Sequence, residues 1–260
     1  MPNKSLGQHW LHDRDVLAHI ADLAEVGPDD TVLEIGPGLG TLTSELLRRA
    51  GRVVAVEFDP DLARKLPAQF PGKNLEVINS DILSFDLSRM PAGYKVVANV
   101  PYYITGKIIN MLTINALTNS NPPQLAVLLV QKEVAERLAA EPGDMSILAV
   151  SAQVFADVSL GDIVPAELFT PPPKVDSQVV SLKFRPTPLV AQEDMKSFFR
   201  VVRAGFSEKR KKLRSSLAGG LGISKQDAEA LLQNAEISPD SRAEQLSIDD
   251  WLNILRSNLL

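Results

Sequence analysis

The segment Asn99–Thr105 (NVPYYIT) holds residue types that suit chemistry on an aromatic amine. The lone pair of such an amine is delocalised into its ring, so the nitrogen is a poor nucleophile. A side-chain amide oxygen and a backbone carbonyl that accept its two hydrogens would favour a tetrahedral nitrogen and orient it toward an electrophile. Asn99 and the Pro101 carbonyl can supply these acceptors, and Tyr102 offers a ring face for a base to stack on. The alternative is a simple strand-to-helix turn with tyrosines in the core.

A glycine-rich turn, Glu34-Ile-Gly36-Pro-Gly38-Leu-Gly40, follows a short apolar segment. Glycines tolerate positive φ and let the backbone come close to a ligand. The dinucleotide fingerprint would need a sixth-position glycine where Thr41 stands, which disfavours a pyrophosphate ligand. The turn resembles the E-x-G-x-G-x-G loop of class I methyltransferases, which cradles the methionyl part of S-adenosylmethionine.

Two carboxylates stand at the ends of the next predicted strands. Glu57 closes the segment RVVAVE, where an acidic residue can accept both hydroxyls of a ribose. Asp81 follows the third strand in NSDIL, where a carboxylate can accept from an adenine amino group. Taken singly, each could be a helix cap or a solvated loop acid. Their order after the glycine turn favours an S-adenosylmethionine site.

Strands and helices must alternate to position these residues. The periodicity predicts strands at 31–35, 52–57, 75–78, 95–98 and 124–130, and helices at 13–25, 41–49, 61–69, 106–117 and 132–140. Two longer β runs are expected at 147–158 and 176–184. This order predicts an α/β fold, a Rossmann-like class I methyltransferase domain with a mostly parallel sheet and an antiparallel edge.

Prolines 186 and 188 mark a predicted domain boundary, after which the pattern is helical. We expect a methyltransferase domain over 1–188 and a small all-helical, RNA-binding domain over 189–260. The helices of the second domain are predicted at 194–206, 209–217, 225–234 and 248–259.

Charge is unevenly distributed along the chain. The net charge is −5, yet Lys196–Arg214 holds eight basic residues and one acidic residue, so that this segment carries +7 and the remainder −12. A basic patch on an acidic body is compatible with RNA binding. The predicted RNA contacts are Lys209, Arg210, Lys211, Lys212 and Arg214. The alternative is a solvated helix face.

The composition gives little support for a cysteine-based site, a metal site or a membrane-spanning segment. There is no cysteine, and the three histidines lack an acidic partner at metalloprotease spacing, so no metal site is expected. The sequence has no apolar stretch of membrane-spanning length. We expect a cytoplasmic protein, without a membrane or protein partner, and a monomer.

Five ordered motifs between Leu6 and about Leu255 resemble one known family, the small-subunit (16S) rRNA adenine-N6,N6-dimethyltransferases known for their link to kasugamycin sensitivity. NVPYYIT is similar to its N-[LI]-P-[YF]-x-[IV]-[ST] motif. The other four are LGQHWL near the N-terminus, FTPPPKVDS at 169–177, FSEKRKKLRSSL at 206–217 and RAEQLS at 242–247.

The resemblance implies the site residues and the reaction. It implies that S-adenosylmethionine is held by His9, Leu11, Gly36, Glu57, Asp81 and Asn99. It implies that Asn99 and Pro101 orient the amine while Tyr102 and Phe169 flank the adenine. The implied product is N6,N6-dimethyladenine at two adjacent adenines in the 3′-terminal hairpin of the rRNA of a pre-30S particle, with S-adenosylhomocysteine released.

Two departures from the family pattern stand near the N-terminus. Trp10 replaces the usual phenylalanine, and the basic N-terminal extension is nearly absent, with Lys4 the only Lys or Arg before Arg14. The second departure lowers the expectation of RNA contacts from that end.

Two other functions remain open. The erythromycin-resistance branch modifies a large-subunit rRNA adenine and shares the first four motifs if the glycine turn is counted, which all lie before residue 206, whereas the 209–217 stretch and the RAEQLS ending favour the small-subunit branch. A ribosome-assembly or transcription factor could keep the fold and bind RNA without turnover. Intact Glu57, Asp81 and Asn99 argue for catalysis.

Overall fold

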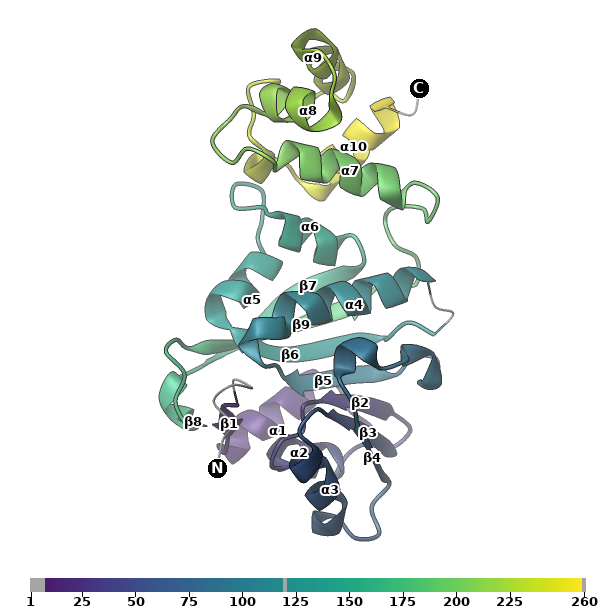
Figure 1. Cartoon of the computed structure of the whole chain (residues 1–260), viewed down its shortest axis with the longest axis vertical. Helices are drawn as coiled ribbons and strands as arrows, with labels where there is room; N and C mark the ends of the chain where they lie inside the picture. Colours follow the sequence, from purple (N-terminus) through teal and green to yellow (C-terminus); the bar gives the residue numbers. More distant parts are fainter. Residues whose placement is uncertain (1–7, 119–120, 259–260) are drawn as a thin grey trace. The chain divides into compact units, whose positions relative to one another are not determined.

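The computed structural model describes residues 8–118 and 121–258 (Figure 1). Its main element is a seven-stranded sheet in the order β4-β3-β2-β5-β6-β9-β7. The first five of these strands are parallel; at one side β9 pairs antiparallel with β6, and β7 pairs antiparallel with β9. Their bounds are β2 (Thr31–Ile35), β3 (Arg52–Glu57), β4 (Leu75–Asn79), β5 (Lys95–Asn99), β6 (Leu125–Gln131), β7 (Ala156–Val164) and β9 (Ser177–Phe184). The expected Rossmann-like α/β fold with an antiparallel edge is confirmed.

Both faces of the central strands are buried, which explains their nearly continuous apolar runs. One face packs in a cluster that includes Val32, Val53 and Val97 with residues of α1 (Arg14–Leu23) and α2 (Thr41–Leu46). The alternate residues, such as Leu33 and Val96, are buried outside this cluster, as are Ile108, Ile109 and Leu112 of α4 (Thr105–Thr118). The remaining elements of this part are α3 (Pro60–Gln69), α5 (Lys132–Leu138), the short β1 (Trp10–Leu11) and β8 (Phe169–Thr170), and the 3₁₀ turns η2 (Ile82–Ser84), η3 (Leu87–Arg89), η4 (Tyr102–Ile104) and η5 (Ala166–Leu168).

Local capping fixes where the helices that flank the site begin. The Asp13 side chain accepts from the backbone N–H groups of Asp15 and Val16 at the start of α1. Asp59 caps α3 in the same way, with Pro60 in the first turn, where its missing N–H costs nothing. These caps fix the residues at which α1 and α3 begin.

The chain divides into two compact units. The first comprises residues 1–136 and 156–186, and the second comprises residues 137–155 and 187–260. The second unit therefore takes in a segment from the middle of the chain, in addition to the region after Pro186. Its helices are α6 (Ile147–Gln153), α7 (Met195–Gly205), α8 (Leu213–Leu221), α9 (Lys225–Asn234) and α10 (Ile248–Asn258), with the 3₁₀ turn η6 (Ala243–Gln245).

The inserted segment is tied to the rest of the second unit by backbone hydrogen bonds. The N–H groups of Gly143 and Met145 both donate to the Glu244 carbonyl, at 2.8 and 3.1 Å. The N–H of Leu189 donates to the Val154 carbonyl at 3.0 Å. The unit boundaries therefore differ from a single division after residue 188.

Two predicted elements are wrong. Residues 147–153 form α6 rather than the start of a strand, and β7 begins only at Ala156. A short apolar run fits a buried helix as well as a strand, and the Ser146 side chain caps this one by accepting from the N–H of Ala149. The predicted helix at 209–217 instead begins at Leu213, after a turn that holds Lys209–Lys212. Like charges three or four residues apart, such as Lys209 with Lys212 and Arg210 with Arg214, disfavour a helix there.

No helix within the described ranges is long and apolar enough to cross a membrane.

Candidate active site

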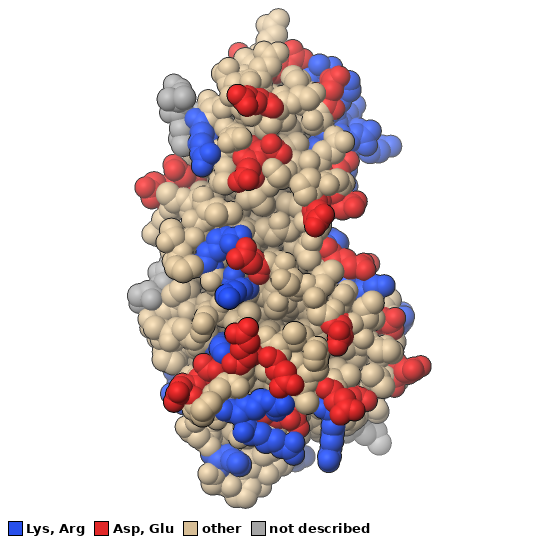
Figure 2. All heavy atoms as spheres, turned by 180° about the vertical axis from the view of Figure 1, so that it is seen from behind, with Lys and Arg blue, Asp and Glu red and all other residues tan. Residues whose placement is uncertain are grey.

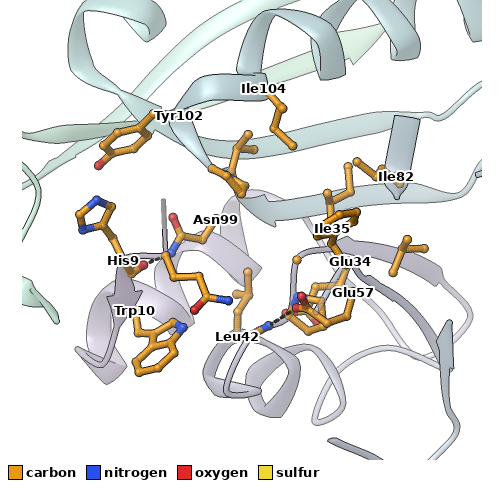
Figure 3. Close-up of a pocket in the computed structure, with 18 of the residues that line it drawn as sticks. His9, Trp10, Glu34, Ile35, Leu42, Glu57, Ile82, Asn99, Tyr102 and Ile104 are labelled. Carbon is orange, nitrogen blue, oxygen red and sulfur yellow. Dashed lines mark hydrogen bonds between the residues drawn. The ribbon is translucent and has the colours of Figure 1, made fainter. Parts of the chain in front are cut away.

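A cavity of about 300 Å³ opens at the carboxyl ends of the parallel strands. This is where ligands bind in open α/β sheets, and the volume lies at the lower end of small-molecule sites. The lining residues come from the N-terminal segment and from the loops after β2, β3, β4 and β5 (Figure 3). Those on which the site depends are His9, Trp10, Leu11, Glu34, Gly36, Gly38, Glu57, Asp81, Asn99, Pro101 and Tyr102.

The glycine turn between β2 and α2 forms one wall of the cavity. Gly36, Gly38 and Gly40 have φ values of 66°, 57° and 84°, in the region that L side chains rarely adopt. A Cβ at Gly40 would also lie 2.7 Å from Leu66 and 3.0 Å from Phe70. The turn therefore depends on glycine, and its backbone can approach a ligand closely.

Glu57 ends β3 and is 5% exposed. One carboxylate oxygen accepts from the N–H of Gly38 at 2.9 Å, and the other accepts from the N–H of Asp59 at 2.8 Å. Burial raises the pKa of Glu57, and these two hydrogen bonds act in the opposite direction. Glu57 thus braces the glycine turn and keeps further lone pairs for a diol ligand.

Asp81 lies after β4 on the cavity wall. Its Oδ1 accepts from the N–H of Leu83 at 2.9 Å and caps η2. The sequence left open whether Asp81 is a cap or a ligand group. The structure shows the cap, and the position in the cavity is compatible with the second role as well.

Asn99 ends β5, and its amide is held in one orientation. The Nδ2 group donates to the backbone carbonyl of His9 at 3.0 Å (Figure 3). Because the nitrogen is committed to this bond, Oδ1 is left as the acceptor for a ligand. The Pro101 carbonyl accepts from the N–H of Ile104 at 3.1 Å, which leaves one of its two lone pairs for a second hydrogen.

Tyr102 is clamped from two sides. Its hydroxyl shares a 2.7 Å hydrogen bond with the Ser177 hydroxyl, and burial raises its pKa. The His9 ring stacks against the Tyr102 ring, with centroids 5.7 Å apart and planes 21° apart. His9 Nδ1 is itself 2.7 Å from the carbonyl oxygen of Pro171. The ring face beside Asn99 is therefore rigidly placed.

Leu11 and Phe169 pair across β1 and β8. Leu11 lines the cavity, whereas Phe169 is 2% exposed and lies in the hydrophobic cluster under α1 and α2. The expected role of Phe169 beside the adenine requires it to line the cavity. In the structure it does not. Alternation along β8 turns Phe169 into the core and Thr170 outward.

Glu34 is a site residue that sequence reasoning missed. It lines the cavity, is 1% exposed, and has no hydrogen bond to either carboxyl oxygen within the described part of the chain. Trp10 also lines the cavity, beside Gly38. The signal for both was present, because Glu34 opens the glycine motif and Trp10 stands inside the N-terminal motif. Lys4 and Leu6 of that N-terminal region lie outside the described residues.

The basic residues of the second unit fall into two groups. Lys209, Arg210 and Lys211 lie exposed in the turn before α8. Lys212 pairs with Asp240 at 2.9 Å, and Arg214 pairs with Glu229 at 3.0 Å and with Asp240 at 3.3 Å. Figure 2 shows basic and acidic side chains interspersed on the face in view. The structure therefore separates the five predicted RNA contacts into three exposed cations in a turn and two in ion pairs.

Across residues 8–118 and 121–258, no group of three or more His, Asp or Glu side chains is arranged to hold a metal ion.

The model of one protein family, described as ribosomal RNA adenine dimethylase, matches residues 2–258. The chain belongs to this family. A relative from Dehalococcoides mccartyi, named ribosomal RNA small subunit methyltransferase A, is 43% identical over 95% of this chain and 85% of its own length. A relative of the same name from Moorella thermoacetica is 42% identical over 99% of this chain and 92% of its own.

Solved structures of the family have the same fold. The 23S rRNA methyltransferase ErmE superimposes with a TM-score of 0.78 and 30% identity, over 95% of this chain and 98% of the other. A dimethyladenosine transferase from Plasmodium falciparum gives 0.79 and 27%, over 95% and 96%. Family membership confirms an S-adenosylmethionine-dependent methyltransferase. The cavity fits this cofactor, because glycines with positive φ form one wall and the buried carboxylate of Glu57 also lines it.

Proposed function

We propose that this chain transfers methyl groups from S-adenosylmethionine to N6 of two adjacent adenines in the 3′-terminal hairpin of small-subunit rRNA. The product is N6,N6-dimethyladenine, and S-adenosylhomocysteine is released. The observation that carries the proposal is the fixed amide of Asn99. Its nitrogen is held by the His9 carbonyl, so its oxygen is available at the rim of a cofactor-sized cavity beside Tyr102.

The chain's residues would act on the amine rather than on the methyl group. S-adenosylmethionine, when bound, supplies an electrophilic methyl on a sulfonium. Asn99 Oδ1 and the Pro101 carbonyl would accept the two N6 hydrogens, so that the nitrogen becomes tetrahedral and its lone pair is no longer delocalised into the ring. With the cofactor held by Glu57, Asp81 and the glycine turn, its methyl would be transferred to this nitrogen, and S-adenosylhomocysteine would be the leaving group. The methylated nitrogen then loses one proton to water, and no strong base is needed.

Binding roles follow from the cavity wall. Glu57 and Asp81 would accept from the ribose hydroxyls and the adenine amino group of the cofactor. Gly36, His9 and Leu11 would approach its methionyl part. Tyr102 would stack on the target base, which leaves its hairpin loop at a lower cost than it would leave a duplex.

Several observations favour small-subunit rRNA over large-subunit rRNA. The relatives that are 42–43% identical carry the small-subunit name, while ErmE is 30% identical. The exposed cations Lys209, Arg210 and Lys211 lie in the stretch whose sequence favours this branch. We place the chain in the cytoplasm as a monomer that acts on a pre-30S particle.

Methyl transfer from labelled cofactor tests the proposal. The substrates are small subunits that lack the modification and, in parallel, naked large-subunit rRNA. We expect about four methyl groups per small subunit, two on each adenine, and none on the large-subunit RNA. Label on the large-subunit RNA alone would assign the chain to the erythromycin-resistance branch. Binding to small subunits without transfer would assign an RNA-binding role.

A further inference from the structure

Tyr103 and Lys107 also line the cavity, outside the group of residues that would hold the cofactor and the amine. Tyr103 is 61% exposed, and within the described ranges no hydrogen bond or ring contact holds it. The neighbouring Tyr102 is half-buried, with its hydroxyl bonded to Ser177 and its ring stacked on His9. An exposed aromatic ring at the mouth of a cavity offers a surface on which a base can stack.

The two tyrosines face different directions because of the turn that carries them. Both lie in η4, a 3₁₀ turn, in which successive side chains point about 120° apart. Tyr102 lies over His9, near Asn99, where the target adenine would bind (Figure 3). Tyr103 therefore cannot form part of the same stack, and it presents its ring outside that stack.

Lys107 adds a positive charge on the side of Tyr103. The η4 turn runs directly into α4, so Lys107, four residues after Tyr103, lies on the same face of the helical segment. Its side chain is exposed and forms no ion pair with a described residue. It is the only lysine or arginine among the described residues that line the cavity, whereas Glu34, Glu57 and Asp81 there are acidic. A cation at the mouth of an otherwise acidic cavity suits an anion that remains at the surface, such as a phosphate.

The surface between these two side chains is open. Gly106 lies on the same face, three residues after Tyr103. Apart from its chain neighbours and the helix backbone, a Cβ added at Gly106 would have no atom within 4 Å. A ring and a cation with space around them match the way proteins hold single-stranded nucleic acid, in which bases stack on aromatic side chains and cations follow the backbone. Stacking accepts every base, because each base has a π-face.

We propose that Tyr103 and Lys107 form a neighbour-nucleotide subsite for the nucleotide next to the target adenine. The Tyr103 ring stacks on its base, and the Lys107 ammonium pairs with the phosphate that joins the two nucleotides. The proposal rests on the proposed function, in which the target lies next to a second adenine. While one adenine is beside Tyr102, its neighbour is one phosphate away and has lost a stacking partner. The subsite replaces that partner.

Methyl transfer in a single turnover tests the stacking half of the proposal. The measurement uses the full chain, saturating cofactor and a range of concentrations of small subunits that lack the modification. Y103A should raise the half-saturating subunit concentration by roughly fivefold to a hundredfold, through the loss of one stacked base, and should lower the maximal rate much less. Y103F keeps the ring and should behave like wild type. A Y103F variant as impaired as Y103A would show that the hydroxyl acts instead, and would overturn the stacking role.

Small subunits with an abasic nucleotide in place of one or the other adenine show which base is stacked. The remaining adenine is the target in each case, and the empty position falls in the subsite in one of the two substrates. In that substrate wild type and Y103A should have the same half-saturating concentration, because no base is left to stack. A Y103A defect that persists undiminished with both substrates would overturn the proposal.

K107Q tests the phosphate contact. It should weaken subunit binding and flatten the log–log salt dependence by roughly 0.7 unit, the value for one contact with a single strand. K65Q is the matched control, because Lys65 is an exposed lysine of α3 that has no ion pair with a described residue and does not line the cavity. Its salt slope should be that of wild type. Equal slopes for K107Q and wild type, or an equal change in K65Q, would overturn the contact.

Calorimetric titration with S-adenosylmethionine separates the subsite from the cofactor site. Y103A and K107Q should bind the cofactor as wild type does. A loss of cofactor affinity as large as the loss of subunit affinity would place these residues against the cofactor and overturn the proposal. If wild type itself transfers no methyl groups to small subunits, the proposed function fails. If wild type transfers them and Y103A half-saturates at the same concentration, only the neighbour-nucleotide subsite fails.

Discussion

The two polar atoms of the Asn99 amide have different roles. Its nitrogen donates to the His9 carbonyl, which joins the N-terminal segment to the end of β5, and its oxygen remains for the substrate. Under the proposed function, the cofactor site and the target site meet at this side chain. His9 contributes twice here, through its carbonyl to Asn99 and through its ring to Tyr102.

Asn99→Ala should slow methyl transfer by about a hundredfold, as removal of one preorganised polar contact in a transition state does. The measurement is a single-turnover rate at saturating cofactor with small subunits as substrate. Cofactor binding is titrated in parallel, so that a lost binding contact is separated from a lost orienting contact. Dimethylation at nearly the wild-type rate would rule out the amine-orienting role.

Glu57→Ala should weaken S-adenosylmethionine binding by roughly tenfold to a hundredfold, about 1.5–3 kcal/mol, since the diol would lose a charge-assisted acceptor. RNA binding should remain almost unchanged. Asp61→Ala is the control, because Asp61 is an exposed carboxylate on the neighbouring α3 that pairs only with Arg64 in the described part of the chain. Unchanged cofactor affinity in Glu57→Ala by calorimetric titration would remove Glu57 from the site.

At the level of elements, the basic turn before α8 differs from the helix that was expected there. In a helix, Leu213 and Leu217 would anchor one side and split the cations between two faces. In the structure Leu213 begins α8 and its N–H donates to the Ser241 carbonyl at 2.7 Å, so that Lys209–Lys211 lie outside the helix. A turn can present these adjacent cations to the same stretch of phosphates.

Replacing Arg210 and Lys211 by glutamine should weaken small-subunit binding and flatten its salt dependence by roughly one unit of log–log slope per lost phosphate contact. The matched control replaces Lys212 and Arg214, which removes the same charge from side chains that are already paired with Asp240 and Glu229. That control should change the slope less. Cofactor affinity should stay the same in both. Identical salt-dependence slopes for wild type and the first variant would show that the turn is a solvated surface that does not contact phosphates.

Substitution of two adjacent glycines of α8 by alanine should change the stability of the chain in opposite directions. A Cβ at Gly220 would lie 2.6 Å from the Cα and Cβ of Ala204 on α7, so the two helices could not stay as close. A Cβ at Gly219 would meet only the end of the Glu208 side chain, at 3.9 Å. Gly220→Ala should destabilise the chain by about 1–3 kcal/mol. Gly219→Ala should stabilise it by about 0.4–1 kcal/mol, because alanine loses less backbone entropy in a helix.

Denaturant unfolding of the two single variants measures this difference. Equal effects of the two substitutions would mean that close approach of α7 and α8 does not limit residue 220.

Sequence patterns predicted these elements to different degrees. The parallel strands were predictable because burial on both faces leaves apolar runs, and Glu57 and Asn99 because strand ends converge at one edge of such a sheet. Residues 147–153 were not, because a short apolar run such as Ile147–Val150 fits a helix as well as a strand until the Ser146 cap is known. The orientation of the Phe169 side chain was not predictable either, because only the pairing of β8 with β1 shows which way it turns.

For the whole molecule, the important feature is that the chain passes between its two units three times, after residues 136, 155 and 186. The segment 137–155 belongs to the helical unit although both of its ends join the sheet unit. A sequence pattern gives no sign of this, because membership of a unit depends on long-range contacts such as those of Gly143 and Met145 with Glu244.

A chain cut after Pro186 should therefore fail to behave as an intact methyltransferase domain. It would retain residues 137–155 but lose their partners, Leu189 and Glu244 among them, and buried residues such as Val150 would be exposed. We expect a lower melting temperature than that of the full chain and binding of a hydrophobic dye. A truncated chain that melts like the full chain and binds no dye would show that the segment is stable without those contacts.

The contact between Met145 and Glu244 also has a consequence for synthesis on the ribosome. Translation proceeds from the N-terminus at about 5–20 residues per second. The carbonyl that receives the Gly143 and Met145 N–H groups is thus made roughly 5–20 seconds after them. During that interval the sheet unit can complete β9 around an inserted segment that has no partner yet. The helical unit of a nascent chain can therefore be completed only when nearly all of the chain has emerged, and until then residues 137–155 remain exposed beside the sheet unit.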